Sequence, residues 1–309
     1  VDPPYPPPSQ NSAPPTQSSA PPTTGSPSDA VKAYLEALAA GQAATALALG
    51  DETPADKTFL TDAVLAESNR RAPITDINVP EVTDEYTYSV DASYKMGEEA
   101  VNDKFSVKKV GNGWKVRKSY AELNLAYARN KTLPMLVNKV AVKTDKIRVF
   151  PGAYAFTSGN KYVDYGSESV VLVQSPNDYP SMSEVKPTLT DAGLTAFEKS
   201  AQAELTACLK KKELAPAGCP FGLRPRSGQK VDESTIVWKL LEDPFANLKP
   251  RLDYQNPAIA EASVSMTVTF TAEGTSYGEK TRFGPQRVYS FAKVSADMTR
   301  EPVKAILSR

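Results

Sequence analysis

Residues 86–116, YTYSVDASYKMGEEAVNDKFSVKKVGNGWKV, decide the fold class of the first folded part of the chain. Apolar and polar residues alternate from Tyr86 to Tyr94, which predicts a strand with one buried and one wet face. MGEE at 96–99 predicts a turn, and GNG at 111–113 predicts a tight hairpin turn. The stretch therefore predicts an antiparallel meander.

Helices are predicted before this meander. Ser26 is the expected N-cap of the first helix, with Pro27 as its first residue. A second helix is expected at 43–49 and a third at about 55–69, where apolar residues recur with helical spacing. Helices followed by an antiparallel meander predict an α+β domain over residues 28–132.

The segments DAVKAYLEALAAGQAATALAL (29–49) and FLTDAVLAESNRRAPITDINV (59–79), with the meander ending in GNGWKV, also carry a family resemblance. They resemble the NTF2-like/cystatin-like repeats of anchored envelope proteins in high-GC Gram-positive bacteria. The resemblance implies a cone-shaped fold and a binding or spacer role outside the cell. Enzymes of that fold usually place an Asp–His pair in the cone, and this chain has no histidine.

Residues 133–188 predict a small all-β module. FPGAYAF at 150–156 places a Pro-Gly turn between two apolar runs, and it resembles the PG-x-Y turn of small β-modules in anchored surface proteins. We expect its aromatic residues to belong to the core. The alternative is an aromatic platform of Tyr154, Tyr162 and Tyr165 that binds a glycan or a peptide.

Residues 189–309 predict a second α+β domain of the cystatin-like kind. Thr190 is the expected cap of a long helix, and residues 214–230 are rich in Pro and Gly and predict a loop. Strands follow, of which 263–271 shows the clearest alternation, and Glu273-Gly274 is the expected turn. The predicted fold class is thus α+β, with two NTF2-like/cystatin-like units around a small all-β module.

Residues 1–27 are dominated by Pro, Ser, Thr and Gln, which predicts a disordered, semi-rigid tether. The chain begins with Val1, and no signal peptide or membrane helix is visible. We therefore expect a membrane or lipid anchor upstream of this sequence. The alternatives are an inter-domain linker or a ligand of a proline-binding domain.

The two cysteines, Cys208 and Cys219, are predicted to form a disulfide that ties the Pro/Gly loop to the helix end. An even number of cysteines fits an oxidising compartment. The alternative is a pair of unrelated buried thiols. The segment CLKKKELAPAGCPFG also resembles a recurrent element of the same anchored ectodomains.

Basic residues flank this loop. They could form a site for an anion such as a lipid headgroup or a phosphate-bearing wall polymer. The alternative is that the lysines only complement the dipole of the preceding helix. The cluster consists of Lys210, Lys211, Lys212, Arg224, Arg226 and Lys230.

Composition excludes several function classes. Among the 309 residues, 36 basic and 36 acidic residues balance, so no global basic field exists for nucleic acid. The absence of histidine excludes Ser-His-Asp, Cys-His and His-metal mechanisms. Ser-x-x-Lys matches begin at Ser106, Ser158 and Ser227, in a predicted strand and in turns rather than at a helix start.

We therefore expect a non-catalytic binding or scaffolding region of an anchored cell-envelope protein, outside the plasma membrane and without cofactor or metal. Its expected partner is an envelope protein or an anionic wall or lipid component, and not nucleic acid. One alternative is an NTF2-like carrier of an apolar ligand or lipid, which would show a deep apolar pocket in the first domain. The other is an envelope hydrolase that uses carboxylates or a serine.

Overall fold

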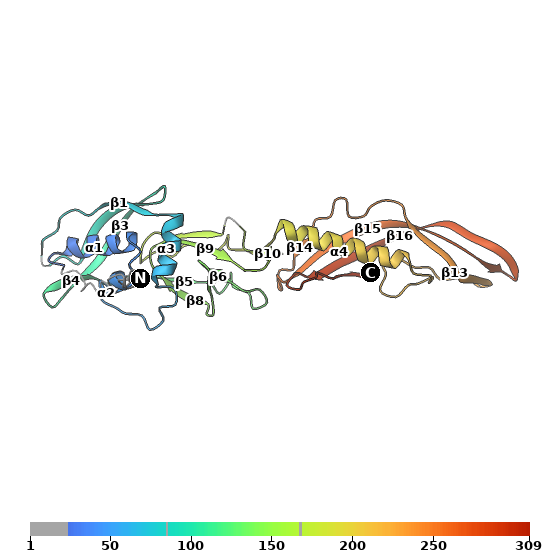
Figure 1. The fold of residues 1–309 in the computed structure, drawn as a ribbon, viewed down its shortest axis with the longest axis horizontal. Helices are drawn as coiled ribbons and strands as arrows, with labels where there is room; N and C mark the ends of the chain where they lie inside the picture. The colour runs from blue at the N-terminus through green and yellow to red at the C-terminus, as the bar shows by residue number, and fades with distance from the viewer. Residues whose placement is uncertain (1–23, 85, 167–168) are drawn as a thin grey trace, which may run out of the picture. The chain divides into compact units, whose positions relative to one another are not determined.

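The computed structural model describes residues 24–84, 86–166 and 169–309 (Figure 1). In these residues the protein is α+β, with several antiparallel sheets and few helices, as expected. The contacts divide the chain into two units. Unit 1 comprises residues 1–55 and 74–119, and unit 2 comprises residues 56–73 and 120–309. Most of the expected tether, residues 1–23, lies outside the described residues.

In the described residues of unit 1, two helices accompany a four-stranded antiparallel sheet of order β1-β2-β3-β4. The first helix contacts all four strands and forms the second layer. The elements are α1 (Pro27–Ala39), α2 (Ala43–Ala48), β1 (Ile74–Asn78), β2 (Ser89–Met96), β3 (Glu99–Val110) and β4 (Gly113–Val116).

Helix α1 begins where the sequence predicts. The Ser26 side chain accepts a hydrogen bond from the Asp29 backbone N–H at 3.1 Å, and the Asp29 carboxylate accepts one from the Ser26 N–H at 3.0 Å. This reciprocal pair is a capping box. Tyr34 of the same helix is fully buried against Phe105 of β3, and its hydroxyl donates to the Ser119 carbonyl at 2.7 Å. The space between helix and sheet is thus filled by side chains.

Two expectations for this region are wrong. Strand β2 begins at Ser89, so Tyr86 and Tyr88 do not face the core but are 81% and 71% exposed. The Asp84 carboxylate accepts the Tyr86 N–H at 3.0 Å, and this local turn keeps the preceding residues out of the sheet. The third helix, α3 (Asp62–Arg71), begins seven residues later than the expected residue 55, because Thr61 caps it through the Val64 N–H.

Unit 2 contains α3 and a set of short strands between residues 121 and 189. They form three small antiparallel sheets of order β5-β8, β11-β9-β6-β7 and β10-β12. The strands are β5 (Ala121–Asn124), β6 (Leu136–Val137), β7 (Val140–Ala141), β8 (Lys146–Val149), β9 (Gly152–Thr157), β10 (Val163–Asp164), β11 (Val170–Val173) and β12 (Thr188–Leu189).

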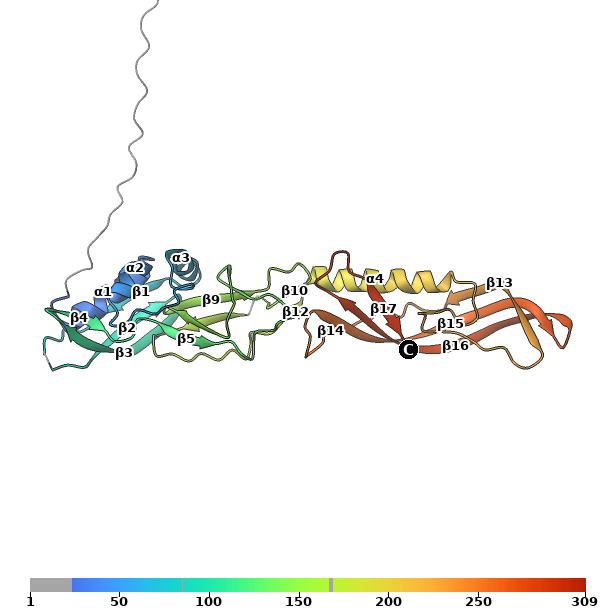
Figure 2. The same cartoon turned by 90° about the horizontal axis from the view of Figure 1, so that it is seen from below.

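The rest of unit 2 is a long helix on a five-stranded antiparallel sheet of order β13-β15-β16-β17, with β14 also paired to β15. The helix runs along one face of the sheet (Figure 2). One hydrophobic core continues from the short strands into this sheet. The elements are α4 (Asp191–Leu209), β13 (Gln229–Leu240), β14 (Arg251–Leu252), β15 (Ile259–Ser276), β16 (Glu279–Asp297) and β17 (Ala305–Ser308).

The expected turn at Glu273-Gly274 is wrong, because β15 continues to Ser276 and turns at Tyr277-Gly278, both with positive φ. Gly274 serves another purpose. A Cβ at that position would lie 2.1 Å from the Lys230 carbonyl oxygen of the neighbouring strand. The glycine therefore permits a close approach of two backbones rather than a change of direction.

The predicted disulfide between Cys208 and Cys219 is confirmed. It ties the last turn of α4 to the Pro/Gly loop, whose next aromatic residue, Phe221, is buried 4.9 Å from the Trp238 ring centroid. The Trp238 indole N–H donates to the Glu213 carbonyl at 3.1 Å. The stapled loop thus covers the part of the sheet that lies beyond the end of α4.

The PG-x-Y turn is the place where α3 meets the sheet. A Cβ on Gly152 would lie 2.1 Å from the Ser68 hydroxyl oxygen, which accepts the Ala153 N–H at 2.8 Å. The Tyr154 hydroxyl donates to the Phe150 carbonyl at 2.7 Å and closes the turn. Gly152, Ala153 and Tyr154 each satisfy a packing or hydrogen-bonding demand of this contact, so these residues have an architectural role.

Gly152→Ala is expected to destabilise unit 2 by about 1–3 kcal/mol, because the added methyl displaces Ser68 or strand β9. Ser68→Ala removes the hydroxyl that the methyl would meet, so the double variant is expected to lose less stability than the sum of the single losses. Urea unfolding by circular dichroism measures this, and hydrogen exchange of residues 150–157 localises it. If the stability loss of the double variant equalled the sum of the two single losses, the contact between Gly152 and Ser68 would be contradicted.

Cys208→Ser/Cys219→Ser is expected to lower the free energy of unfolding of unit 2 by about 2–3 kcal/mol, because the open chain regains the entropy that the short loop removes. Guanidinium unfolding followed by tryptophan fluorescence measures the loss. Dithiothreitol should shift the natural chain by the same amount and leave the double variant unchanged. Equal free energies of unfolding for the oxidised natural chain and the double variant would refute this role.

Candidate functional site

The proposed aromatic platform is not present on the surface. Tyr154, Tyr162 and Tyr165 are all buried, because both faces of β9 and the segment around β10 are covered by other parts of the core. The Tyr162 hydroxyl donates to the Glu301 carboxylate at 3.1 Å. Burial raises the pKa of Tyr154 above its ordinary range and that of Tyr165 to about 12. The alternative of an aromatic platform is therefore wrong, and the three rings are core residues, as expected for the aromatic residues of this module.

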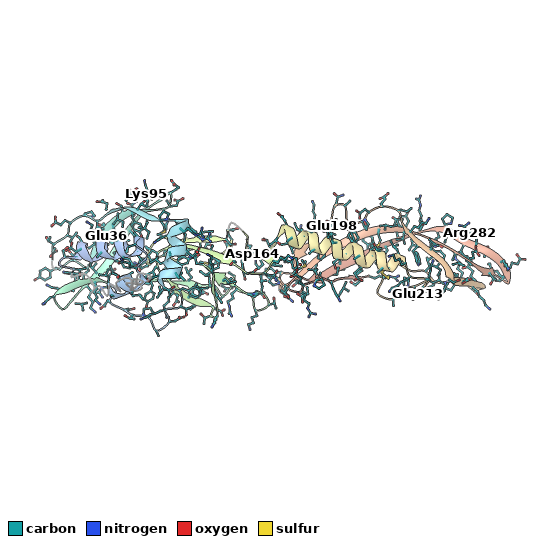
Figure 3. The ribbon with its side chains drawn as sticks, viewed as in Figure 1. Glu36, Lys95, Asp164, Glu198, Glu213 and Arg282 are labelled. Atoms are coloured by element: carbon teal, nitrogen blue, oxygen red, sulfur yellow. A yellow bond between two sulfur atoms is a disulfide. The ribbon has the colours of Figure 1, made fainter. Side chains whose placement is uncertain are left out.

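The basic cluster at the disulfide loop is divided by the structure. Lys211 donates to the Ala217 carbonyl at 2.6 Å and Lys212 donates to the Ile236 carbonyl, so both hold the loop in place. Figure 3 shows Glu213 just past the end of α4, at the start of this loop.

Four cations of the cluster remain available to a ligand. They are exposed, and within residues 24–84, 86–166 and 169–309 their side chains form no ion pair. They are Lys210, Arg224, Arg226 and Lys230.

A groove of about 740 Å³ in unit 2 is the main feature that the sequence did not reveal. Residues 127–130, 182–183, 185–187, 252–254 and 257 line it, and these three segments are far apart in the chain. Its walls are largely apolar, and they include the buried Val185 and the partly buried Met182 and Leu252.

Two fully exposed tyrosines flank this groove, Tyr127 at 100% and Tyr254 at 98% exposure. Each lies in a tight turn. The turn of Tyr127 follows β5 and is closed by the Ala128 and Arg129 N–H groups on the Leu125 carbonyl. The turn of Tyr254 connects β14 to β15.

Side-chain hydrogen bonds hold the second turn and join it to the first. The Asp253 carboxylate accepts the N–H groups of Gln255 and Asn256 at 3.0 and 2.7 Å. The Asn130 amide donates to the Gln255 carbonyl at 3.3 Å, so the two turns are linked across the groove. The tyrosine rings therefore extend from a braced backbone.

Charged groups complete the lining. Arg129 donates through Nη1 to Asp145 at 2.6 Å, which leaves its other N–H groups for a ligand. Lys186 is exposed and lies 4.0 Å from Glu184. The groove thus combines apolar walls, two aromatic rings and cationic donors, which is the composition of a binding site for an uncharged or weakly acidic ligand.

A sequence signal for this site existed in the isolated tyrosines of the turn segments LAYARN (125–130) and DYQNP (253–257). An aromatic residue between turn residues is exposed unless the loop folds back. What could not be derived is that these turns meet, because that depends on the packing of β5 and β14 into one unit.

Two further observations concern metal binding and membrane-spanning helices. In the part of the chain that the structure describes, no three or more His, Cys, Asp or Glu side chains cluster in a way that could hold a metal ion. Among the described helices, none combines the length and the apolar character that crossing a membrane requires.

Comparisons with known proteins add no identity. No protein-family model, curated protein or solved structure matches this chain. The resemblance to envelope repeats therefore stays a prediction from the residues.

Proposed function

We propose that this protein is a non-catalytic binding region that works outside the plasma membrane, as part of an anchored cell-envelope protein. The groove between Tyr127 and Tyr254 carries this proposal. Exposed tyrosines around an apolar groove favour ligand binding, because their rings offer large contact area and their hydroxyls offer a hydrogen bond. The sheet and helices are complete without these two rings, so folding alone does not account for them.

The disulfide supports the proposed compartment, since disulfides persist in oxidising surroundings. The helix-on-sheet layers in both units are consistent with NTF2-like/cystatin-like folds, which remain part of the proposal.

A carrier function has less support. The interior of unit 1 between α1 and the sheet is filled by large side chains such as Tyr34, Leu35 and Phe105. The hollow of about 470 Å³ on this unit is lined instead by polar residues of β1–β3, among them Asn78, Asn102 and Lys104. Such a lining does not suit a lipid.

A carboxylate hydrolase also has less support. Asp91 and Asp103 both border the hollow on unit 1. However, Asp91 pairs with Lys104 in the sheet register, and Ala92 pairs with Asp103. The two carboxylates therefore belong to opposite faces of the sheet, and they do not converge on one substrate bond as an acid/base pair must.

The double variant Tyr127→Ala/Tyr254→Ala is expected to bind an envelope preparation from the source cells at least tenfold more weakly than the natural chain. Tyrosines that become buried on binding contribute much of the binding free energy of such contacts. Co-sedimentation measures the bound fraction. Tyr86→Ala removes an exposed tyrosine of unit 1 and is the matched control. Equal binding of all three proteins, or no binding of the natural chain, would refute the groove as a binding site.

A second candidate function is binding of an anionic polymer by the four available cations of the disulfide loop. Changing Lys210, Arg224 and Arg226 together to Gln is expected to abolish salt-sensitive binding to poly(glycerol phosphate), because exposed charges attract over roughly a Debye length of 8–10 Å. The control triple variant of Lys57, Lys143 and Lys249 removes equal charge elsewhere. Isothermal titration calorimetry at two salt concentrations measures the affinity of each variant for the polymer. An equal loss of affinity in both triple variants would contradict the site.

A further inference from the structure

The hydrogen-bonding groups of the groove are unevenly divided between donors and acceptors. Arg129 and Lys186 can only donate, and the hydroxyls of Tyr127 and Tyr254 can donate outward from their exposed rings. Asp253 is the one carboxylate among the described lining residues, and its Oδ1 already accepts two backbone N–H groups. The groove therefore suits a ligand that is rich in acceptors and poor in donors.

A proline-rich polypeptide is such a ligand. Proline has no backbone N–H, and a polyproline II strand leaves its carbonyl oxygens without internal partners. Aromatic-lined grooves recognise these strands because the rings pack on the pyrrolidine faces at low entropic cost. A glycan fits less well, since each sugar hydroxyl brings a donor that needs an acceptor.

This chain itself contains a segment of that composition. Residues 1–23, VDPPYPPPSQNSAPPTQSSAPPT, include nine prolines, of which five fall within residues 3–8. The one charge of its side chains is Asp2, whose sign is complementary to that of Arg129 and Lys186.

We propose that the groove between Tyr127 and Tyr254 binds the proline-rich segment, residues 1–23, of a second copy of this chain. The proposal rests on the groove being the binding site of the proposed function. Each copy offers one proline-rich segment and one groove, which are different surfaces. The contact is therefore heterologous, and copies can associate either by reciprocal exchange of segments in a closed assembly or head to tail in an open one.

Analytical ultracentrifugation of the full chain tests the association. The natural chain is expected to show a mass that rises with concentration. Tyr127→Ala/Tyr254→Ala loses the groove but keeps the strand, and is expected to associate at least tenfold more weakly. Changing Pro3, Pro4, Pro6, Pro7 and Pro8 to Ala loses the strand but keeps the groove, and is expected to do the same. Tyr86→Ala, the control, associates like the natural chain.

Mixing the two deficient variants gives the sharper test. One supplies an intact proline-rich segment and the other an intact groove, so an equimolar mixture is expected to form a one-to-one complex at concentrations at which each variant alone stays monomeric. A synthetic peptide of residues 1–15 is expected to bind the proline variant and not the tyrosine variant. Circular dichroism checks that both variants are folded.

Three results would overturn the proposal. The first is association that survives in the tyrosine variant. The second is a peptide that binds the proline variant while the natural chain stays monomeric at all concentrations, which would mean that the segment occupies the groove of its own chain. The third is no peptide binding at all. If groove-dependent binding to envelope persists in this last case, the proposed function stands and only the identity of the ligand is wrong.

Discussion

The structure of unit 2 depends on covering one apolar face of the long β15–β16 hairpin. Alternate residues of β15, from Ala260 to Ala272, are buried, and so are Ala292, Val294 and Ala296 of β16. Burial of this face supplies the main favourable free energy, because apolar area removed from water contributes about 25 cal/mol per Å². Helix α4 contributes Phe197, Ala201 and Leu205 to the core that covers this face.

The stapled loop continues this cover where the helix ends. The Phe221 and Trp238 rings pack against each other there in a tilted arrangement, and the disulfide and Lys211 hold the loop over them. The lysines beyond the helix therefore have two different tasks. Lys211 and Lys212 donate to backbone carbonyls of the loop and of β13 and thereby hold the cover in place, whereas the side chains of the other cations face the solvent or a ligand.

In the groove, exposed side chains are carried by an ordered backbone. Its tyrosines lie in solvent, yet the turns that present them are closed by side-chain and backbone hydrogen bonds. A braced backbone lowers the entropy lost on binding, because the rings need only settle their own rotamers. Exposed aromatic rings on an ordered frame are therefore better explained by recognition than by folding.

Local spacing and residue type were enough to predict the α+β class, the capped starts of α1 and α4 and the disulfide, and the composition excludes histidine chemistry. The packing of distant segments placed Tyr154, Tyr162 and Tyr165 in the core and brought Tyr127 and Tyr254 to one groove. Local pattern can suggest that a tyrosine in a turn is exposed, but it does not show which segments of the chain come together around a ring. Burial depends on which distant segments pack against the ring, and that is settled by the whole core rather than by neighbours in the chain.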